Sequence, residues 1–235
     1  MTDQTMRYPE LEKLGPYKAL TGTWLMMLQH GVSSRSLNEI EAELYIKQAI
    51  GIGMVGSEKT RAIIDLIEDA SDAMREVQFN GLHVHRLSMP LGEPYLRLYG
   101  ALNASFLMTG ALGQLAELFM PEQKGTFLTQ LRNQPLHILR NRLAAHPLDF
   151  SPTKAIYHRL VQMDMMRLDG KRSYTASDIG YQEVDIIEQM KQFEKTSLGV
   201  FLETTEHKVL DVIRSDSEHR SWVKERLDFV RSFLS

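Results

Sequence analysis

A stretch rich in leucine, alanine, methionine and phenylalanine runs from Ala101 to Met120. Its length is close to the roughly 20 apolar residues that a membrane-spanning helix needs. Asn103, Gln114 and Glu117 lie within it, however, and polar side chains are costly in the hydrocarbon core of a bilayer. The stretch therefore favours a helix buried inside a bundle of helices. We expect the protein to have no membrane partner.

Composition limits the remaining classes of protein. A length of 235 residues suggests a single domain, residues 1–235, that can bury a core without cross-links. The absence of cysteine excludes a disulfide scaffold, a cysteine zinc site and a cysteine nucleophile. A net charge of −3 provides no global field to attract a polyanion, although it is compatible with a local basic patch. The N-terminus is polar and lacks an apolar signal core, so we expect a cytoplasmic protein.

Apolar residues recur at the 3.6-residue spacing of amphipathic helices along most of the chain. Ser36 and Ser215 are each followed three residues later by Glu, which is the spacing of a capping box, and Ser57 has the position of an N-cap. Pro121 predicts a break, and Pro135 predicts a kink or a restart within the next helical region. The predicted helices cover about residues 39–50, 57–77, 95–120, 122–145, 179–213 and 219–234, with a loop over 80–94.

Residues 156–176 have a different pattern, in which apolar and polar side chains partly alternate. Asp169 and Gly170 form a dipeptide that is typical of tight hairpin turns. We therefore predict a β-hairpin over residues 156–176. The predicted fold is mainly α, a helical bundle with a small β-hairpin before the C-terminal helices.

Two short motifs that could bind a cofactor or a metal lack the context that such sites need. Gly51, Gly53 and Gly56 match the glycine spacing of a dinucleotide-binding fingerprint, but no strand is predicted before them, so a helix C-cap and turn is favoured. His83 and His85 could point the same way from a strand, but no third metal ligand lies beside them. We expect no cofactor and no metal ion.

The segment from Lys124 to Leu148 concentrates positive charge and contains no Asp or Glu. Such a stripe on a helix can attract phosphate groups. Its cations are Lys124, Arg132, Arg140 and Arg142, and it also contains His137 and His146. Lys124, Arg132 and Arg142 are candidates for nucleic-acid binding. The alternative is that these cations pair with acidic helices elsewhere in the chain.

A short motif lies inside this segment. Residues 139–147 read LRNRLAAHP, in which Arg140 is followed by Asn141 and, after five intervening residues, by His146. This motif resembles the R-x4–6-H signature of HEPN domains (higher eukaryote and prokaryote nucleotide-binding), in which the residue after the arginine is often Asn, Asp or His. The candidate catalytic residues are therefore Arg140, Asn141 and His146.

Two other pairs, Arg132 with His137 and Arg214 with His219, have the same spacing. Pro135 lies inside the first of them and disrupts its helix, so Arg140 with His146 is preferred. The preceding helix, PYLRLYGALNASFLMTGALGQLAELF, is also similar to the helix that precedes this motif in HEPN-like bacterial proteins. The resemblance covers about residues 94–150.

The resemblance implies a function as well as a fold. HEPN proteins often form bundles of four or five helices that pair as homodimers, and many are metal-independent endoribonucleases that act as toxins or phage-defence effectors. For this chain it implies an RNA endonuclease, with a cognate inhibitor protein as a further partner. Other members of the family have lost catalysis, so the alternative is a catalytically inactive HEPN-like interaction or regulatory module.

The candidate residues suit metal-free RNA cleavage. Histidine transfers protons near neutral pH, so His146 would act as general acid or base. Arginine offers a planar, permanently charged fork, so Arg140 would bind the scissile phosphate while Asn141 orients one of the two by a hydrogen bond. Acid and base together need two such histidines, which a symmetric homodimer would supply. Alternatively, His146 caps the end of its helix and Arg140 serves as a structural ion-pair partner.

Overall fold

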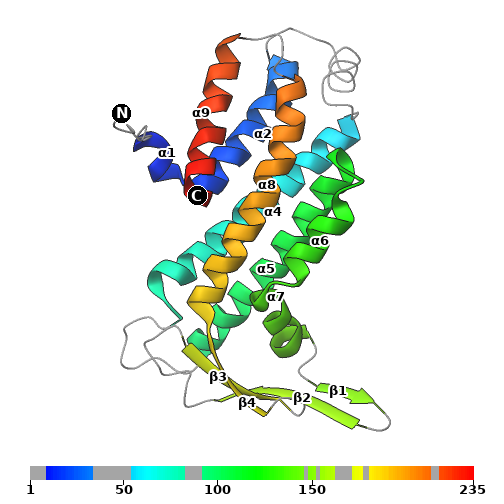
Figure 1. Ribbon diagram of the computed structural model, residues 1–235, viewed down its shortest axis with the longest axis vertical. Helices are drawn as coiled ribbons and strands as arrows, with labels where there is room; N and C mark the ends of the chain where they lie inside the picture. The colour runs from blue at the N-terminus through cyan, green and yellow to red at the C-terminus, as the bar shows by residue number, and fades with distance from the viewer. Residues whose placement is uncertain are drawn as a thin grey trace. The chain divides into compact units, whose positions relative to one another are not determined.

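The structure is a computed structural model that describes residues 9–33, 54–82, 92–145, 148–151, 154–161, 171–176, 180–212 and 217–235 (Figure 1). The described chain is mainly helical and carries a small antiparallel sheet before its C-terminal helices, so the predicted fold class is confirmed. The helices are α1 (Pro9–Leu14), α2 (Pro16–Ser33), α4 (Met54–Asn80), α5 (Gly92–Phe119), α6 (Lys124–Arg132), α7 (Pro135–Arg140), the π-helical turn η1 (Asn141–Ala145), α8 (Ile186–Val212) and α9 (Ser217–Leu234). The strands are β1 (Leu148–Ser151), β2 (Lys154–Leu160), β3 (Lys171–Ala176) and β4 (Gly180–Asp185).

The chain divides into two compact units, and each is described by itself. Unit 1 comprises Met1–Glu68, Ala111–Lys124 and Leu198–Ser235. Unit 2 comprises Asp69–Gly110 and Gly125–Ser197. Helices α4, α5 and α8 each contribute one part to unit 1 and the other part to unit 2. The prediction of a single domain over residues 1–235 stays a prediction.

Unit 1 is held together by aromatic side chains of α2. The fully buried indole of Trp24 donates a hydrogen bond to Thr205 Oγ1 of α8 (2.9 Å), and its ring centroid lies 4.8 Å from that of Phe119. Tyr17 stacks on Phe201 of α8. Helix α9 packs against α2. Helices α1 and α2 were not predicted from the sequence, although α2 supplies much of this core.

Unit 2 buries side chains from every helix that it contains. The N-terminal part of α5, α6 from Gly125 onward and α7 bring large apolar groups into this core, as does the first half of α8. The buried residues are Met74, Val77, Leu98, Leu102, Met108, Phe127, Leu131, Leu136, Leu139, Met190 and Phe193. Gln78 of α4 also donates a hydrogen bond to Glu194 of α8 (3.0 Å). This core fixes α7 beside the middle of α5, where the candidate site lies.

Helix α5 matches the long apolar helix that was predicted over about residues 95–120. Most of its apolar side chains are buried, including Leu102, Met108 and Leu112. Among the described helices, none combines the length and the apolar character that crossing a membrane requires.

Glycine and proline set several helix boundaries. Helix α4 ends at Asn80, because Gly81 adopts a positive φ of 73° and its N–H bonds to the carbonyl of Val77 (2.8 Å). Helix α5 ends before Pro121, as predicted. Pro135 begins α7, where its fixed φ and missing N–H are tolerated, so it restarts the helix rather than kinking it. The long predicted region 122–145 is therefore three shorter elements.

The sheet extends the predicted hairpin. Strands β2 and β3 pair antiparallel, with Leu160 opposite Tyr174 and His158 opposite Ala176, which confirms the hairpin over residues 156–176. Strands β1 and β4 add to its two edges, giving the order β1-β2-β3-β4. The predicted turn at Asp169 and Gly170 lies outside the described residues.

Three local predictions are wrong. Residues 180–185 form strand β4 rather than the start of the helix predicted from residue 179, because β3 pairs with them along its whole length. Helix α8 begins only at Ile186, where Asp185 Oδ1 accepts the backbone N–H of Glu188 (3.0 Å) as an N-cap. Helix α4 begins at Met54, so Ser57 is not its N-cap and Gly56 lies inside the helix rather than in a turn.

Several other predictions fall outside the described residues. They are the helix over 39–50, the capping boxes that begin at Ser36 and Ser215, Gly51, Gly53, His83 and His85.

Candidate functional site

Arg140 and Asn141 lie where the α-helical geometry of α7 changes to a π-helical turn. Helix α7 ends at Arg140, and η1 begins with Asn141. The backbone N–H of Asn141 bonds to the carbonyls of His137 and Ile138, so helical hydrogen bonding continues from α7 into η1. Single π-helical turns are uncommon and occur frequently at functional sites. The motif predicted from the sequence thus coincides with a local irregularity of the helix.

Arg140 is held by neutral groups. Its guanidinium carbon lies 3.9 Å from the centre of the Phe106 ring, which α5 presents, and its Nη1 donates to Asn141 Oδ1 (3.2 Å). Its Nε is buried and has no hydrogen-bond partner among the described residues. No carboxylate in the described part of the chain pairs with it. The structure thus contains a hydrogen bond between Asn141 and Arg140, in which Arg140 donates. The alternative role of Arg140 as a structural ion-pair partner finds no acidic partner among the described residues.

His137 is a neighbour of Arg140 that is not among the candidate catalytic residues. Its ring is only 4% exposed and lies 6.1 Å from the Phe106 ring. Its Nδ1 lies 3.4 Å from Thr109 Oγ1. Because Thr109 donates its only hydroxyl proton to the carbonyl of Ser105 (2.9 Å), we assign the proton of this contact to Nδ1 of His137.

The surroundings of His137 favour its neutral form. Burial lowers the pKa of His137 below the usual 6.5, and the positive charges of Arg140 and Arg132 lower that pKa further. His137 is therefore an uncharged ring that packs near Phe106, the side chain on which the guanidinium of Arg140 lies. Its spacing of three residues from Arg140 on one helix is a signal that could have identified it as a neighbour.

The lowered pKa of His137 predicts a loss of stability in acid. At a pH well above 6.5 the His137 ring is neutral in both the folded and the unfolded state, whereas at lower pH the unfolded chain binds the proton more readily. The free energy of unfolding should therefore fall as the pH drops through 6.5 and towards the lowered native pKa. Urea midpoints at about pH 7.5 and about pH 5.5 measure this change. The midpoint of wild type should drop by more than that of His137→Gln, and equal drops would contradict the prediction.

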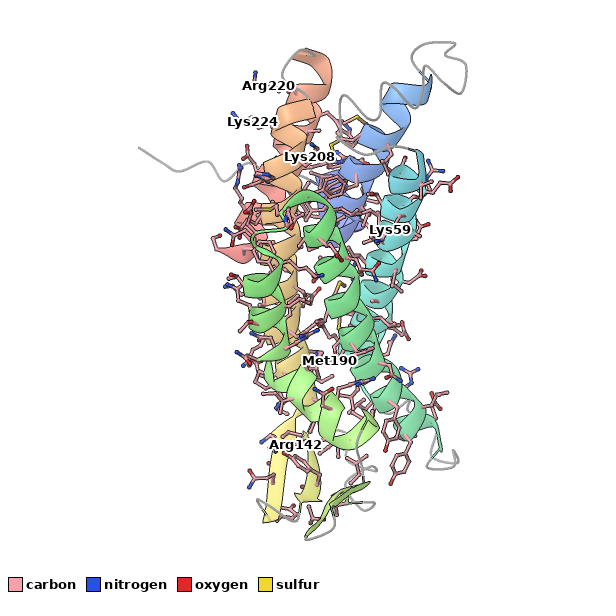
Figure 2. All side chains as sticks on the ribbon, turned by 90° about the vertical axis from the view of Figure 1, so that its right-hand side faces the viewer. Lys59, Arg142, Met190, Lys208, Arg220 and Lys224 are labelled. Atoms are coloured by element: carbon pink, nitrogen blue, oxygen red, sulfur yellow. The ribbon has the colours of Figure 1, made fainter. Side chains whose placement is uncertain are left out.

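The three candidate nucleic-acid-binding residues have different surroundings. Arg142, in η1, donates from Nη1 to the hydroxyl of Tyr174 on β3 (3.1 Å), and Figure 2 shows it beside the strands. Arg132 is exposed in the last turn of α6. Lys124 belongs to unit 1 and forms an ion pair with Glu117 of α5 (3.1 Å). For this residue the structure has the alternative stated above, in which a cation of the segment pairs with an acidic residue of another helix. Only Arg142 and Arg132 thus belong to the same unit as Arg140.

His146 lies outside the described residues, so its position relative to Arg140 stays a prediction. The same holds for His83 and His85. Within the ranges that the structure describes, no three His, Asp or Glu side chains gather closely enough to hold a metal ion.

Comparison with known proteins adds no further constraint. No protein-family model, no curated protein and no solved structure matches this chain. The HEPN-like assignment stays a resemblance of residues 94–150.

Proposed function

We propose that this chain is a metal-independent RNA endonuclease of HEPN type. Arg140 binds the scissile phosphate, Asn141 orients Arg140, and His146 transfers a proton. The resemblance of LRNRLAAHP to the HEPN signature supports this proposal. A growth-arresting or phage-defence role, a cytoplasmic location and a cognate inhibitor protein belong to the same proposal.

The observation that carries the proposal is the way in which Arg140 is held. A structural arginine is usually neutralised by a carboxylate, because an unpaired charge is costly to remove from water. Among the described residues, Arg140 instead contacts the ring of Phe106 and the amide of Asn141, which orient the guanidinium without cancelling its charge. An oriented, uncancelled guanidinium is suited to bind a phosphate through two parallel hydrogen bonds.

The cleavage step needs no metal ion. The 2′-oxygen of the RNA bonds to phosphorus and gives up its proton to a base, while the bond from phosphorus to the 5′-oxygen breaks and that oxygen receives a proton from an acid. The products are a 2′,3′-cyclic phosphate and a free 5′-hydroxyl. His137 is buried, so we assign both proton transfers to His146 residues that a homodimer brings to one site.

The test is cleavage of end-labelled RNA by purified protein in excess EDTA. We expect wild type to cut and to leave 2′,3′-cyclic phosphate ends, and His146→Ala to be slower by about 10²–10⁴-fold, the usual contribution of general acid–base catalysis. His207→Ala, which changes an exposed histidine of α8, is the matched control and should cut like wild type. If wild type does not cut, or if His146→Ala cuts equally fast, the proposal is wrong.

A catalytically inactive HEPN-like interaction module is the second candidate. It is favoured by partly exposed apolar side chains around Arg140, namely Phe106 (45%), Leu107 (44%) and Ile138 (42%). A partner protein could cover such a surface. The same RNA assay separates the two functions, since this module would not cut RNA with or without His146.

A further inference from the structure

A row of aromatic side chains runs along α5 from the candidate site towards the N-terminus of the helix. Phe106, which the guanidinium of Arg140 contacts at 3.9 Å, marks the flank of α5 that faces this site. Tyr99 precedes Phe106 by seven residues and Tyr95 precedes it by eleven, and each spacing returns to within about 20° of the same direction around a helix. The three rings therefore lie on one flank of α5, and all belong to unit 2.

Tyr95 and Tyr99 form a stacked pair that is partly exposed. Their ring centroids lie 6.3 Å apart with 17° between the ring planes, and both side chains are only half-buried. Burial raises the pKa of the Tyr99 hydroxyl above its usual 10.0, and Tyr95 raises it further, so Tyr99 carries no negative charge near neutral pH. The pair thus presents aromatic surface to the solvent without repelling an anion.

The charges on α5 suit a polyanion along this flank. Residues 95–106 contain no Asp or Glu. Glu93 and Arg97 form an ion pair with each other (3.1 Å), and each lies two residues from a tyrosine of the pair, about 200° away around the helix axis. The exposed Asn103 lies between the pair and Phe106 and carries a neutral amide. A phosphate backbone along this flank therefore meets no carboxylate of α5.

An arginine followed by aromatic rings on one flank is typical of proteins that bind single-stranded RNA. Arginine binds the phosphates, and unpaired nucleobases stack on the rings. From Phe106 to Tyr95 the flank is about 16 Å long, at 1.5 Å per residue. A few nucleotides of a single strand would therefore reach from Arg140 to the tyrosine pair.

We infer that Tyr95 and Tyr99 form a base-stacking platform for the RNA strand whose phosphate Arg140 binds. This inference rests on the function proposed above and names the class of substrate, which is single-stranded RNA with unpaired bases beside the scissile phosphate. Every base has a ring face, so the platform accepts all four bases. It selects against duplexes, in which the bases are already paired and stacked on one another.

The chain offers a matched control for the tyrosine pair. Phe79 of α4 also belongs to unit 2, is 74% exposed and has the guanidinium carbon of Arg75 at 5.4 Å from its ring centre. It lies on another helix, away from the flank that Phe106 marks. Phe79→Leu thus removes an aromatic ring beside an arginine without touching the platform. Tyr99→Phe keeps the ring of the platform and removes only the hydroxyl.

The test is the binding of a fluorescent single-stranded RNA, measured by anisotropy at several salt concentrations. Its riboses are 2′-O-methylated, so the strand cannot be cut through its own 2′-oxygen. Tyr95→Leu/Tyr99→Leu should bind at least about fivefold more weakly than wild type, whereas Tyr99→Phe and Phe79→Leu should stay within about twofold. The salt slope of the double variant should equal that of wild type, because a stacked base releases no counterions. Arg140→Ala should instead reduce that slope by about one phosphate contact.

A second measurement uses only wild-type protein and does not depend on how well a variant folds. A strand of the same length without nucleobases keeps every phosphate. Wild type should bind this abasic strand at least about fivefold more weakly than the complete strand. The difference between the two strands should shrink in Tyr95→Leu/Tyr99→Leu, because both changes remove the same contact.

Three results would overturn the inference while the proposed function stands. In the first, wild type binds and cuts RNA, and Tyr95→Leu/Tyr99→Leu binds as tightly as wild type. In the second, the double variant binds the complete and the abasic strand equally more weakly, which is the result of a merely structural role. In the third, sedimentation shows that the double variant breaks a homodimer, so that the flank contacts a second copy rather than bases. If wild type neither binds nor cuts RNA, the proposed function fails and the inference fails with it.

Discussion

Arg140→Ala is expected to slow RNA cleavage by about 10²–10³-fold, which is the usual cost of removing one group that stabilises charge in a transition state. The physical reason is that the charge on the phosphate oxygens rises as the 2′-oxygen attacks. Arg140 is already oriented for this charge by Phe106 at 3.9 Å and by Asn141 at 3.2 Å. Its removal therefore loses stabilisation that no other group in the described site replaces at the same position. Single-turnover cleavage in EDTA measures the effect.

Variants around Arg140 separate its charge from its orientation. Arg140→Lys keeps the charge but loses the planar fork, so we expect its cleavage rate to lie between those of wild type and Arg140→Ala, about tenfold or more below wild type. Phe106→Leu keeps an apolar side chain and removes the aromatic ring that contacts the guanidinium. A cation–π contact at an exposed site contributes about 0.5–1 kcal/mol, so we expect the cleavage rate to fall several-fold.

The control for Arg140 is an arginine of the same charge outside the site. Arg61→Ala removes an exposed arginine from α4 in unit 1 and should leave the cleavage rate unchanged within about twofold. If Arg140→Ala cuts within about threefold of wild type, or if Arg61→Ala loses as much as Arg140→Ala, then Arg140 does not bind the scissile phosphate.

Local signals in the sequence predicted most of the helices. Long apolar periodicity identified α5. Pro135 predicted a kink or a restart, and the structure has the restart at α7, because a proline at the first helical position restricts the backbone regardless of the rest of the fold. Strand β4 was wrongly predicted as helix. Its residues Gly180–Asp185 directly precede a strong helical pattern, and only the pairing of Val184 with Arg172 and of Gln182 with Tyr174 makes them a strand. Such tertiary pairing overrides local propensity.

The candidate site was predicted only in part. The position of Arg140 beside Asn141 could be predicted from the motif, since the two residues are adjacent in sequence. The contact between Arg142 and Tyr174 could not, because 32 residues separate them and the register of β3 decides which side chain meets the arginine. The burial of His137 is equally a product of packing, in this case of α7 on α5 at Thr109 and Phe106.

The second large effect is expected in unit 1, from Trp24→Ala. Trp24 is fully buried, and 181 residues separate it in sequence from its hydrogen-bond partner Thr205. Its ring also packs on Phe119, so one side chain joins α2 to α8 and to the end of α5. Truncation of such a residue leaves a large cavity, and we expect the free energy of unfolding to fall by about 3–5 kcal/mol. Urea denaturation followed by far-UV circular dichroism measures this loss without depending on tryptophan fluorescence.

Two further variants divide this loss into packing and hydrogen bonding. Trp24→Phe keeps a large ring and loses the indole N–H. Because the hydroxyl of Thr205 still donates to the carbonyl of Phe201 (2.7 Å), we expect the free energy of unfolding to fall by only about 1–2 kcal/mol. Thr205→Val keeps the volume but leaves the indole N–H buried without an acceptor, which costs about 1–3 kcal/mol. If Trp24→Ala costs less than about 1 kcal/mol, the indole is not a central contact of unit 1, because a cavity of that size in a packed core cannot form at so low a cost.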